Sequence, residues 1–415
     1  SKEVLNDLLV MKFGGTSMGS AERIRVAASI CAGQLRERPV VAVVSAMSKI
    51  TDLLLDTLRK AEAGDESGVD FNLHKLRERH HETCMQLLEG DERAGALMAI
   101  DNLIAGFRRI VHGVRFLGER PPRSVDAAVA TGEMLSACMM AAHLECCGIP
   151  ARAVNAAQVI VTDAVFGNAS PLMEETRARA AAVLVPLLDQ GILPVVTGFN
   201  GATVDGRETT LGRGGSDFSG SILAAVLDAA EFWIWTDVDG IMSADPRLVP
   251  DARVLDEVTY NEAAELAYNG AKVLHPRTLA PLVERQIPVW SKNSFNLAHK
   301  GTRIVPDTPH LPGPRAVTSI SNVALISVEP ASSAITGARI MARVLDSLAS
   351  ADAEVLAFSS SSYRESFCFL VRGEELDAVL RNLEASLALE LAHGYLKPVS
   401  VDNNVGLVAV VGEGM

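Results

Sequence analysis

Two glycine-containing segments are the strongest candidates for chemistry in this 415-residue sequence. The first is Lys12–Ser17 (KFGGTS), which stands between a predicted strand and a predicted helix. Its glycines allow a ligand to approach the backbone, the amides of a helix N-terminus attract anions, and Lys12 adds a positive charge. This combination suits a phosphate group, although a tight turn with an exposed lysine would show the same pattern. The order of residues matches neither a P-loop nor a Rossmann motif.

The second segment is Leu211–Asp217 (LGRGGSD), which also precedes a predicted helix. Three glycines within four positions lower the stability of the folded chain through their conformational entropy, so they indicate a specific role. Arg213 can bind a carboxylate through two hydrogen bonds, and Ser216 or Asp217 can cap the helix. We therefore expect a second anion site that faces the first, with Asp217 orienting the groups around a transferred phosphoryl group. A flexible loop followed by a helix cap would explain the same residues.

Polar residues follow several other predicted strands. They form the segments Ser45–Thr51 (SAMSKIT), Thr131–Glu133 (TGE), Trp235–Gly240 (WTDVDG) and Asp245–Arg247 (DPR). Open α/β sheets bind ligands beyond the carboxyl ends of their strands, so these segments are candidates for the same site. Taken singly, each one could be an ordinary turn or helix cap. No residue is assigned as a metal ligand, because His80-His81-Glu82 lacks the second histidine that a zinc-binding HExxH helix needs.

Strands and helices alternate over roughly the first 300 residues. We predict strands at 8–11, 40–45, 151–155, 192–197, 231–235 and 287–291, the last of this region. We predict helices at 20–34, 51–60, 70–88, 93–115, 134–147, 171–190 and 217–230, and a capping box at Thr259–Glu262 that opens one more. The continuous apolar runs and the alternation indicate a mostly parallel sheet between two layers of helices.

A proline-rich break ends this region. Four prolines within nine residues, at 306, 309, 312 and 314, predict a linker. Strands at 322–328, 354–358, 366–371 and 396–401, with helices at 340–349 and 374–388, then follow the β-α-β-β-α-β order of a ferredoxin-like domain. We interpret a further strand, Val405–Val411, as the start of an incomplete domain.

Composition excludes several classes of protein. The net charge is −13, which is not the electrostatic footprint of a protein that binds nucleic acid or an anionic membrane. Apolar runs such as 40–44 are strand-sized, far below the ~18–20 residues of a membrane span. The first residues do not resemble a signal peptide, and the six cysteines form no C-x-x-C pair. We therefore expect reduced thiols and a cytoplasmic location.

Together these motifs resemble the aspartate kinase family. The matching segments, in the family's order, are Lys12–Ser17, Ser45–Thr51, Thr131–Glu133, Thr209–Asp217, Trp235–Arg247 and Gly270–Pro276. The details are most similar to the kinase portion of aspartate kinase–homoserine dehydrogenase fusions. The resemblance implies an amino-acid-kinase α/β/α sandwich over 1–305, a linker over 306–315, an ACT regulatory domain over 316–401 and the start of a second ACT unit over 402–415.

The resemblance also implies an activity. Family members transfer the γ-phosphoryl group of ATP, with Mg²⁺ on its phosphates, to the side-chain carboxylate of L-aspartate. The product is 4-phospho-L-aspartate, on the route to lysine, threonine and methionine. A homodimer or larger homo-oligomer and an amino-acid effector, lysine or threonine, are expected as well. The family leaves open a glutamate kinase-like enzyme or a non-catalytic ACT sensor, but the pair Arg213 and Glu133 favours aspartate.

Site residues are carried over by motif. Lys12, Gly14 and Gly15 would hold the ATP phosphates, and Asp217 would organise the transfer centre. The aspartate substrate would contact Arg213 through its α-carboxylate and Glu133 through its ammonium, with a pocket completed by Ser45, Thr51, Phe199 and Ser216. The nucleotide would be surrounded by Thr236, Asp237, Arg247 and Lys272.

Two positions depart from the family pattern. Met242 stands where many members have a tyrosine beside the nucleotide. Residues 359–363 (SSSSY) lack the glutamine that relatives often carry in the ACT region. Together with the expected incomplete second ACT unit, this predicts weak or absent feedback inhibition by lysine and threonine.

Overall fold

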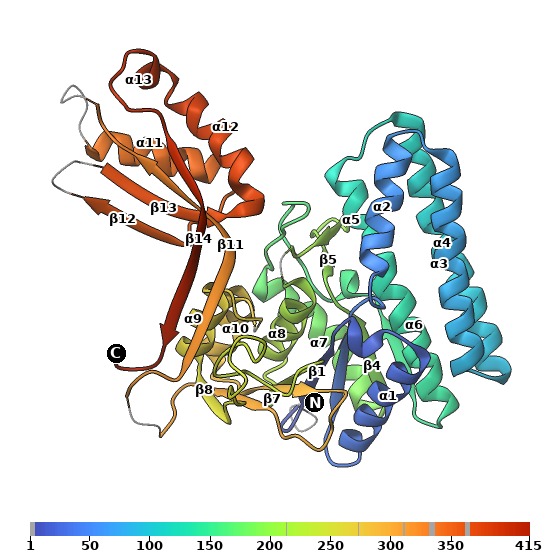
Figure 1. The fold of residues 1–415 in the computed structure, drawn as a ribbon. Helices are drawn as coiled ribbons and strands as arrows, with labels where there is room; N and C mark the ends of the chain where they lie inside the picture. Colours follow the sequence, from blue (N-terminus) through green and yellow to red (C-terminus); the bar gives the residue numbers. More distant parts are fainter. Residues whose placement is uncertain (1–4, 213, 273, 310–311, 332–336, 362–365) are drawn as a thin grey trace. The chain divides into compact units, whose positions relative to one another are not determined.

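The computed structural model describes residues 5–212, 214–272, 274–309, 312–331, 337–361 and 366–415 (Figure 1). The chain divides into two compact units. The first comprises Ser1–Met242, Arg253–Ala264 and Leu274–His310, and the second comprises Ser243–Ala252, Glu265–Val273 and Leu311–Met415.

The described part of the first unit is built on an eight-stranded sheet. Its order is β3-β4-β2-β1-β7-β9-β10-β8, and all neighbours are parallel except β9 and β10. The strands are β1 (Leu9–Phe13), β2 (Val40–Val44), β3 (Ala151–Val154), β4 (Leu193–Thr197), β7 (Glu231–Thr236), β8 (Glu257–Thr259), β9 (Val289–Asn293) and β10 (Thr302–Val305). Every residue of β1, β2 and β4 is buried, as their apolar runs predict.

Helices cover both faces of this sheet, so the predicted three-layer sandwich is confirmed. One face carries α1 (Ala21–Leu35) and α6 (Thr131–Cys146), and the other carries α7 (Met173–Asp189) and α8 (Gly215–Val226). Beside α6 lies a group of long helices, seen in blue and cyan in Figure 1: α2 (Ile50–Glu62), α3 (Glu66–Leu87) and α4 (Gly90–Leu117). The remaining elements are α5 (Pro122–Val129), α9 (Tyr260–Tyr268), α10 (Pro276–Arg285) and the hairpin β5 (Asn200–Ala202) and β6 (Glu208–Thr210).

One helical run, 122–146, is long and apolar enough to cross a membrane by length and composition alone. However, 72% of its most apolar window is buried within the protein. Burial of this kind is typical of a core helix in an α/β sandwich.

The second unit contains the predicted ferredoxin-like arrangement. Its antiparallel sheet has the order β12-β13-β11-β14, with helices α11 and α12 packed on each other. The elements are β11 (Ala316–Val328), α11 (Gly337–Ser350), β12 (Ala357–Ser361), β13 (Ser366–Arg372), α12 (Leu376–Ser386), α13 (Ala388–Ala392) and β14 (Ser400–Val411).

Two sequence-based expectations about elements need correction. The two strands predicted at 396–401 and 405–411 are one strand, β14, which pairs with β11 along its length. Register shifts on both sides of Val323 let β14 continue through Asn403 and Asn404. The strand predicted at 287–291 is not the last of the kinase-like region, because β10 follows it and pairs with it.

The observed units also divide the chain differently from the boundaries drawn from the sequence. Two segments before residue 305, Ser243–Ala252 and Glu265–Val273, belong to the second unit. The Val317 amide donates to the Ser243 carbonyl oxygen at 2.8 Å, and the Tyr268 hydroxyl donates to the Val355 carbonyl oxygen. In the predicted linker, the Arg315 amide donates to the Val411 carbonyl oxygen at 2.8 Å.

Candidate active site

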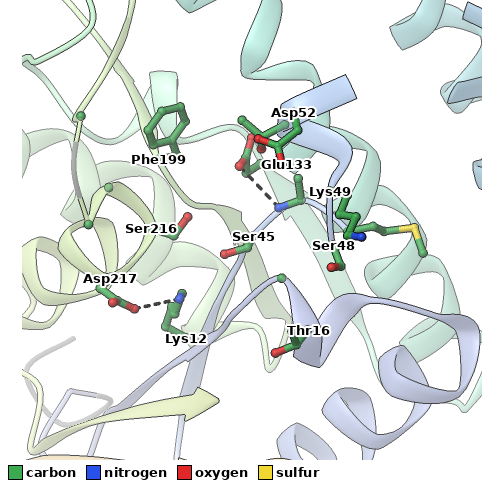
Figure 2. Close-up of a pocket in the computed structure, with 17 residues that line it drawn as sticks. Lys12, Thr16, Ser45, Ser48, Lys49, Asp52, Glu133, Phe199, Ser216 and Asp217 are labelled. Atoms are coloured by element: carbon green, nitrogen blue, oxygen red, sulfur yellow. Dashed lines mark hydrogen bonds and ion pairs between the residues drawn. The ribbon is translucent and has the colours of Figure 1, made fainter. Parts of the chain in front are cut away.

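A pocket of about 530 Å³ lies in the first unit, beyond the carboxyl ends of β1 and β2 (Figure 2). Parallel strands collect their carboxyl ends at one edge, so segments far apart in sequence meet there. Among the predicted site residues, the pocket lining includes Lys12, Gly15, Ser45, Thr51, Glu133, Phe199, Ser216 and Asp217.

Lys12 provides the buried positive charge of this pocket. It sits in β1, is only 9% exposed, and its Nζ lies 2.8 Å from Oδ1 of Asp217. A Cβ atom added to Gly14 would lie 3.3 Å from Nζ. The absence of a side chain at residue 14 therefore leaves room for the Lys12 amine. Burying an ammonium group is costly unless it is paired, and Asp217 supplies the pairing charge.

Asp217 and Ser216 lie in the first turn of α8 rather than at its cap. The helix begins at Gly215, after Gly214 in the left-handed conformation with φ of +67°, so the expectation that Ser216 or Asp217 caps it is wrong. The glycine at the cap lets the chain turn sharply and brings both side chains to the pocket. A carboxylate in the first turn is also favoured by the helix dipole.

Glu133 is a buried carboxyl group at the opposite wall. It is 3% exposed, and its Oε1 accepts a hydrogen bond from the Ala46 amide at 3.4 Å. Its Oε2 is buried without a hydrogen-bond partner, and no described residue forms an ion pair with it. Burial raises the pKa of Glu133 from 4.5 to about 8. The group is therefore suited to receive a cation from a ligand.

Two close approaches shape the walls. A Cβ atom on Gly132 would lie 2.9 Å from the Ala46 Cβ, so α6 packs against the loop after β2 only because residue 132 is glycine. A Cβ atom on Gly215 would collide with the Phe199 ring. Phe199 itself has φ of +78°, a strained conformation held by a 2.8 Å hydrogen bond from its amide to Ser219 Oγ. Strain of this kind concentrates at functional sites.

The loop after β2 contributes more residues than the sequence analysis assigned. Ser48 and Lys49 line the pocket together with Ser45, and the first turn of α2 adds Asp52 beside the predicted Thr51. Asp52 stands in α2 and Glu133 in α6, and both line the pocket (Figure 2). The helical spacing of Ser48, Thr51 and Asp52, at i, i+3 and i+4, is a signal that could have indicated a shared face. Thr16, from the first glycine segment, also lines the pocket.

Other predicted site residues lie outside this lining. The Gly14 amide donates to the Trp235 carbonyl oxygen at 3.3 Å, so it is engaged by the protein itself. Thr236 hydrogen-bonds within its own turn, to the Val238 amide at 3.3 Å, and Asp237 is exposed. Arg247 and Lys272 belong to the second unit, where Arg247 pairs with Asp245 at 2.8 Å. Arg213 lies outside the described residues.

Comparisons with known proteins agree on one family. Residues 7–293 match the model of the amino acid kinase family. The chain is 35% identical over 413 residues to the bifunctional aspartokinase/homoserine dehydrogenase 1, chloroplastic, of Arabidopsis thaliana; the match covers 98% of this chain and 45% of that protein. The chain thus spans less than half the length of this relative.

Solved structures give the same result. E. coli aspartokinase III in complex with aspartate and ADP (R-state) superimposes with a TM-score of 0.84 at 30% identity, covering 98% of this chain and 88% of that one. Aspartokinase III in complex with lysine and aspartate (T-state) gives a TM-score of 0.80 at 31% identity, covering 98% and 87%. The chain therefore belongs to the amino acid kinase family, and within it to the aspartokinases.

Proposed function

We propose that this chain transfers the γ-phosphoryl group of ATP to the side-chain carboxylate of L-aspartate, which yields 4-phospho-L-aspartate and ADP. The observation that carries this proposal is that one pocket holds two complementary sites. A buried lysine beside a glycine turn suits a phosphoryl group, and the unpaired Oε2 of Glu133 suits an ammonium group. The similarity to an aspartokinase bound to aspartate and ADP supports the same assignment.

Lys12 neutralises the charge that develops as the phosphoryl group moves. One carboxylate oxygen of aspartate attacks the γ-phosphorus, the bond from that phosphorus to the β,γ-bridging oxygen breaks, and ADP leaves with the electron pair. The nucleophile is already ionised, so no general base is needed. Asp217, 2.8 Å from Lys12, holds the ammonium in place, and catalysis depends on positioning and charge stabilisation. Mg²⁺ enters with ATP as part of that substrate.

Glu133 recognises the α-ammonium of aspartate. The ion pair forms in a water-poor wall, where it replaces the missing partner of Oε2. We assign the α-carboxylate to Arg213, because a guanidinium group binds a carboxylate with two hydrogen bonds. We assign the rest of this subsite to four other residues of the pocket lining: Ser45, Thr51, Phe199 and Ser216. We assign Gly15, which lines the same pocket, to the part that holds the ATP phosphates.

The remaining assignments rest on family resemblance. Thr236, Asp237, Arg247 and Lys272 would surround the nucleotide, and Gly14 would shape the turn beneath the phosphates. We further propose a homo-oligomer, an amino-acid effector such as lysine or threonine, and a cytoplasmic location. The lysine complex of aspartokinase III supports an amino-acid effector in the family.

The test is a coupled assay of ADP release with ATP, Mg²⁺ and either L-aspartate or L-glutamate. We expect turnover with L-aspartate, with hydroxylamine trapping the acyl phosphate as the hydroxamate. Turnover with L-glutamate alone would assign the chain to a different carboxylate kinase. Absence of turnover with both amino acids would contradict an enzymatic role and favour a binding function for the second unit.

A further inference from the structure

Two loops frame the pocket, and one side chain outside the pocket connects them. The first loop, residues 14–19, follows β1, and the second loop, residues 45–49, follows β2. Arg79 reaches both from helix α3: its Nη1 donates to the Ser48 carbonyl oxygen at 2.6 Å, and its Nη2 donates to the Gly19 carbonyl oxygen at 3.2 Å. Arg79 does not line the pocket itself.

The groups around the Arg79 guanidinium favour its hydrogen bonds to these two carbonyl oxygens. Its side chain is partly buried, both acceptors are neutral carbonyl groups, and no described carboxylate pairs with it. Its neighbour His80 is fully buried, with a pKa lowered to about 4 by burial, and is therefore neutral near pH 7. Since no described carboxylate compensates for the hydration that the guanidinium group loses, its hydrogen bonds to these two carbonyl oxygens favour the observed position of the planar fork.

The two loops also pack directly on each other. A Cβ atom added to Gly15 would lie 3.5 Å from the Ala46 carbonyl oxygen, and one added to Gly19 would lie 3.6 Å from the Ser48 Cβ.

Other hydrogen bonds of the two loops tie them to the chain after β9 and to the end of β1. Ser17 Oγ lies 2.7 Å from Ser294 Oγ, which ties the first loop to the chain after β9. The Ser45 amide donates to the Phe13 carbonyl oxygen at 3.0 Å, at the point where both strands end. Between the far ends of the loops, Arg79 is the one described side chain that hydrogen-bonds to both.

We infer that Arg79 is a positioning residue that sets the separation of the two loops and thereby aligns the phosphoryl donor with its acceptor. This inference rests on the proposed function, in which the first loop lies at the ATP phosphates and the second at aspartate. Of the two loops, ATP contacts only the first, at Gly14 and Gly15, and aspartate contacts only the second, at Ser45, so each substrate can bind alone when the loops separate. Transfer needs both substrates in line, and a displacement of about 1 Å can lower the rate a hundredfold.

The test compares three variants of the full chain. Arg79→Met keeps the side-chain length but removes both hydrogen bonds, and Arg79→Lys keeps the charge without the planar fork. The control, Arg77→Met, changes an arginine on the same helix that is 53% exposed and pairs with Asp101 at 3.3 Å. Circular dichroism and melting temperature report folding, and titrations measure the dissociation constants of ATP and aspartate separately.

We expect Arg79→Met to lower kcat by about 10- to 100-fold, while each dissociation constant changes less than about threefold. Slow aspartate-independent ATP hydrolysis should persist, so the ratio of hydrolysis to transfer should rise. Arg79→Lys should fall between Arg79→Met and wild type, and Arg77→Met should match wild type.

Two results would overturn the positioning role: a kcat of Arg79→Met within twofold of wild type, or dissociation constants that weaken in proportion to the loss of kcat. If Arg79→Met does not fold, the same criteria apply to Arg79→Lys. An inactive wild-type chain would overturn the proposed function together with this role, whereas an active wild type with an active Arg79→Met variant overturns this role alone.

Discussion

Lys12 is the one charged residue in an otherwise apolar strand, and its role is testable at the scale of a single side chain. Lys12→Ala should lower kcat by about a hundredfold or more, because a pre-organised cation at the transfer centre is lost. The fold should persist, since the rest of β1 remains packed. Lys60→Ala, which removes a half-exposed helical pair with Asp56 at 3.0 Å, is the control. Near wild-type turnover in Lys12→Ala would contradict the assignment.

Glu133 predicts a pH dependence for aspartate binding. Because burial raises the pKa of Glu133 to about 8, the carboxyl group is mostly neutral below pH 8, whereas the substrate ammonium needs the ionised form. Binding therefore requires loss of a proton at pH 7, and each unit below the pKa costs up to about 1.4 kcal/mol. The KM for L-aspartate should fall as the pH rises from 6.5 to 8.5, while the KM for ATP stays nearly constant.

The variant Glu133→Gln shows whether the pH dependence of aspartate binding comes from Glu133 or from another titrating group. It should raise the KM for aspartate by about 30-fold or more, because one partner of a buried ion pair is gone. It should also remove the pH dependence of that KM. A KM for aspartate that is flat with pH in the wild type would show that Glu133 is ionised without substrate or does not contact it.

The sequence predicted which residues share a pocket where a residue type carries its own chemistry. Lys12, Glu133 and Asp217 stand in recognisable segments at strand ends, and the structure brings all three into one pocket. Arg79 left no such signal, since it acts on backbone carbonyls of loops distant in sequence. Only the folded chain shows which carbonyls its guanidinium group meets.

At the scale of elements, the packing of α6 against the second loop depends on one glycine. In Gly132→Ala, the new methyl group would press on Ala46, whose amide holds Glu133. We expect a loss of about 1–3 kcal/mol in the free energy of unfolding and a rise of roughly tenfold in the KM for aspartate. Denaturant titration and steady-state kinetics measure the two effects.

The matched control lies at the other end of the same helix. Gly148 has φ of +79° and open space around it, so Gly148→Ala should cost about 1–2 kcal/mol of stability through backbone strain alone. Its KM for aspartate should equal that of wild type. An equal rise of KM in both variants would mean that general destabilisation, not the contact with Ala46, explains the effect.

Helices and strands were predicted correctly where the local sequence has a clear pattern, and were missed where it has none. The capping box at Thr259 and Glu262 is present, with reciprocal bonds of 2.9 and 3.0 Å. The three-residue strand β8 was missed because it is too short to show a period. The length of β14 was missed because Asp and Asn disfavour strands, and only its pairing with β11 overrides that preference.

At the scale of the whole molecule, the second unit includes a segment that carries a predicted nucleotide contact. Lys272 lies two residues after Gly270, within Glu265–Val273. In the same unit, Thr318 of β11 donates through Oγ1 to the Asn269 carbonyl oxygen at 3.4 Å. A Cβ atom on Gly270, whose φ is +103°, would collide with the Ile320 side chain. The position of Lys272 therefore depends on the packing of this segment against β11.

Gly270→Ala should disturb that packing and raise the KM for ATP about tenfold, with little change in the KM for aspartate. The control is Gly394→Ala, which also replaces a glycine with positive φ in the second unit but has open space around it. Both variants should lose stability through backbone strain, and only Gly270→Ala should affect ATP. An unchanged KM for ATP in Gly270→Ala, despite a lower melting temperature, would mean that nucleotide binding does not depend on how the second unit holds this segment.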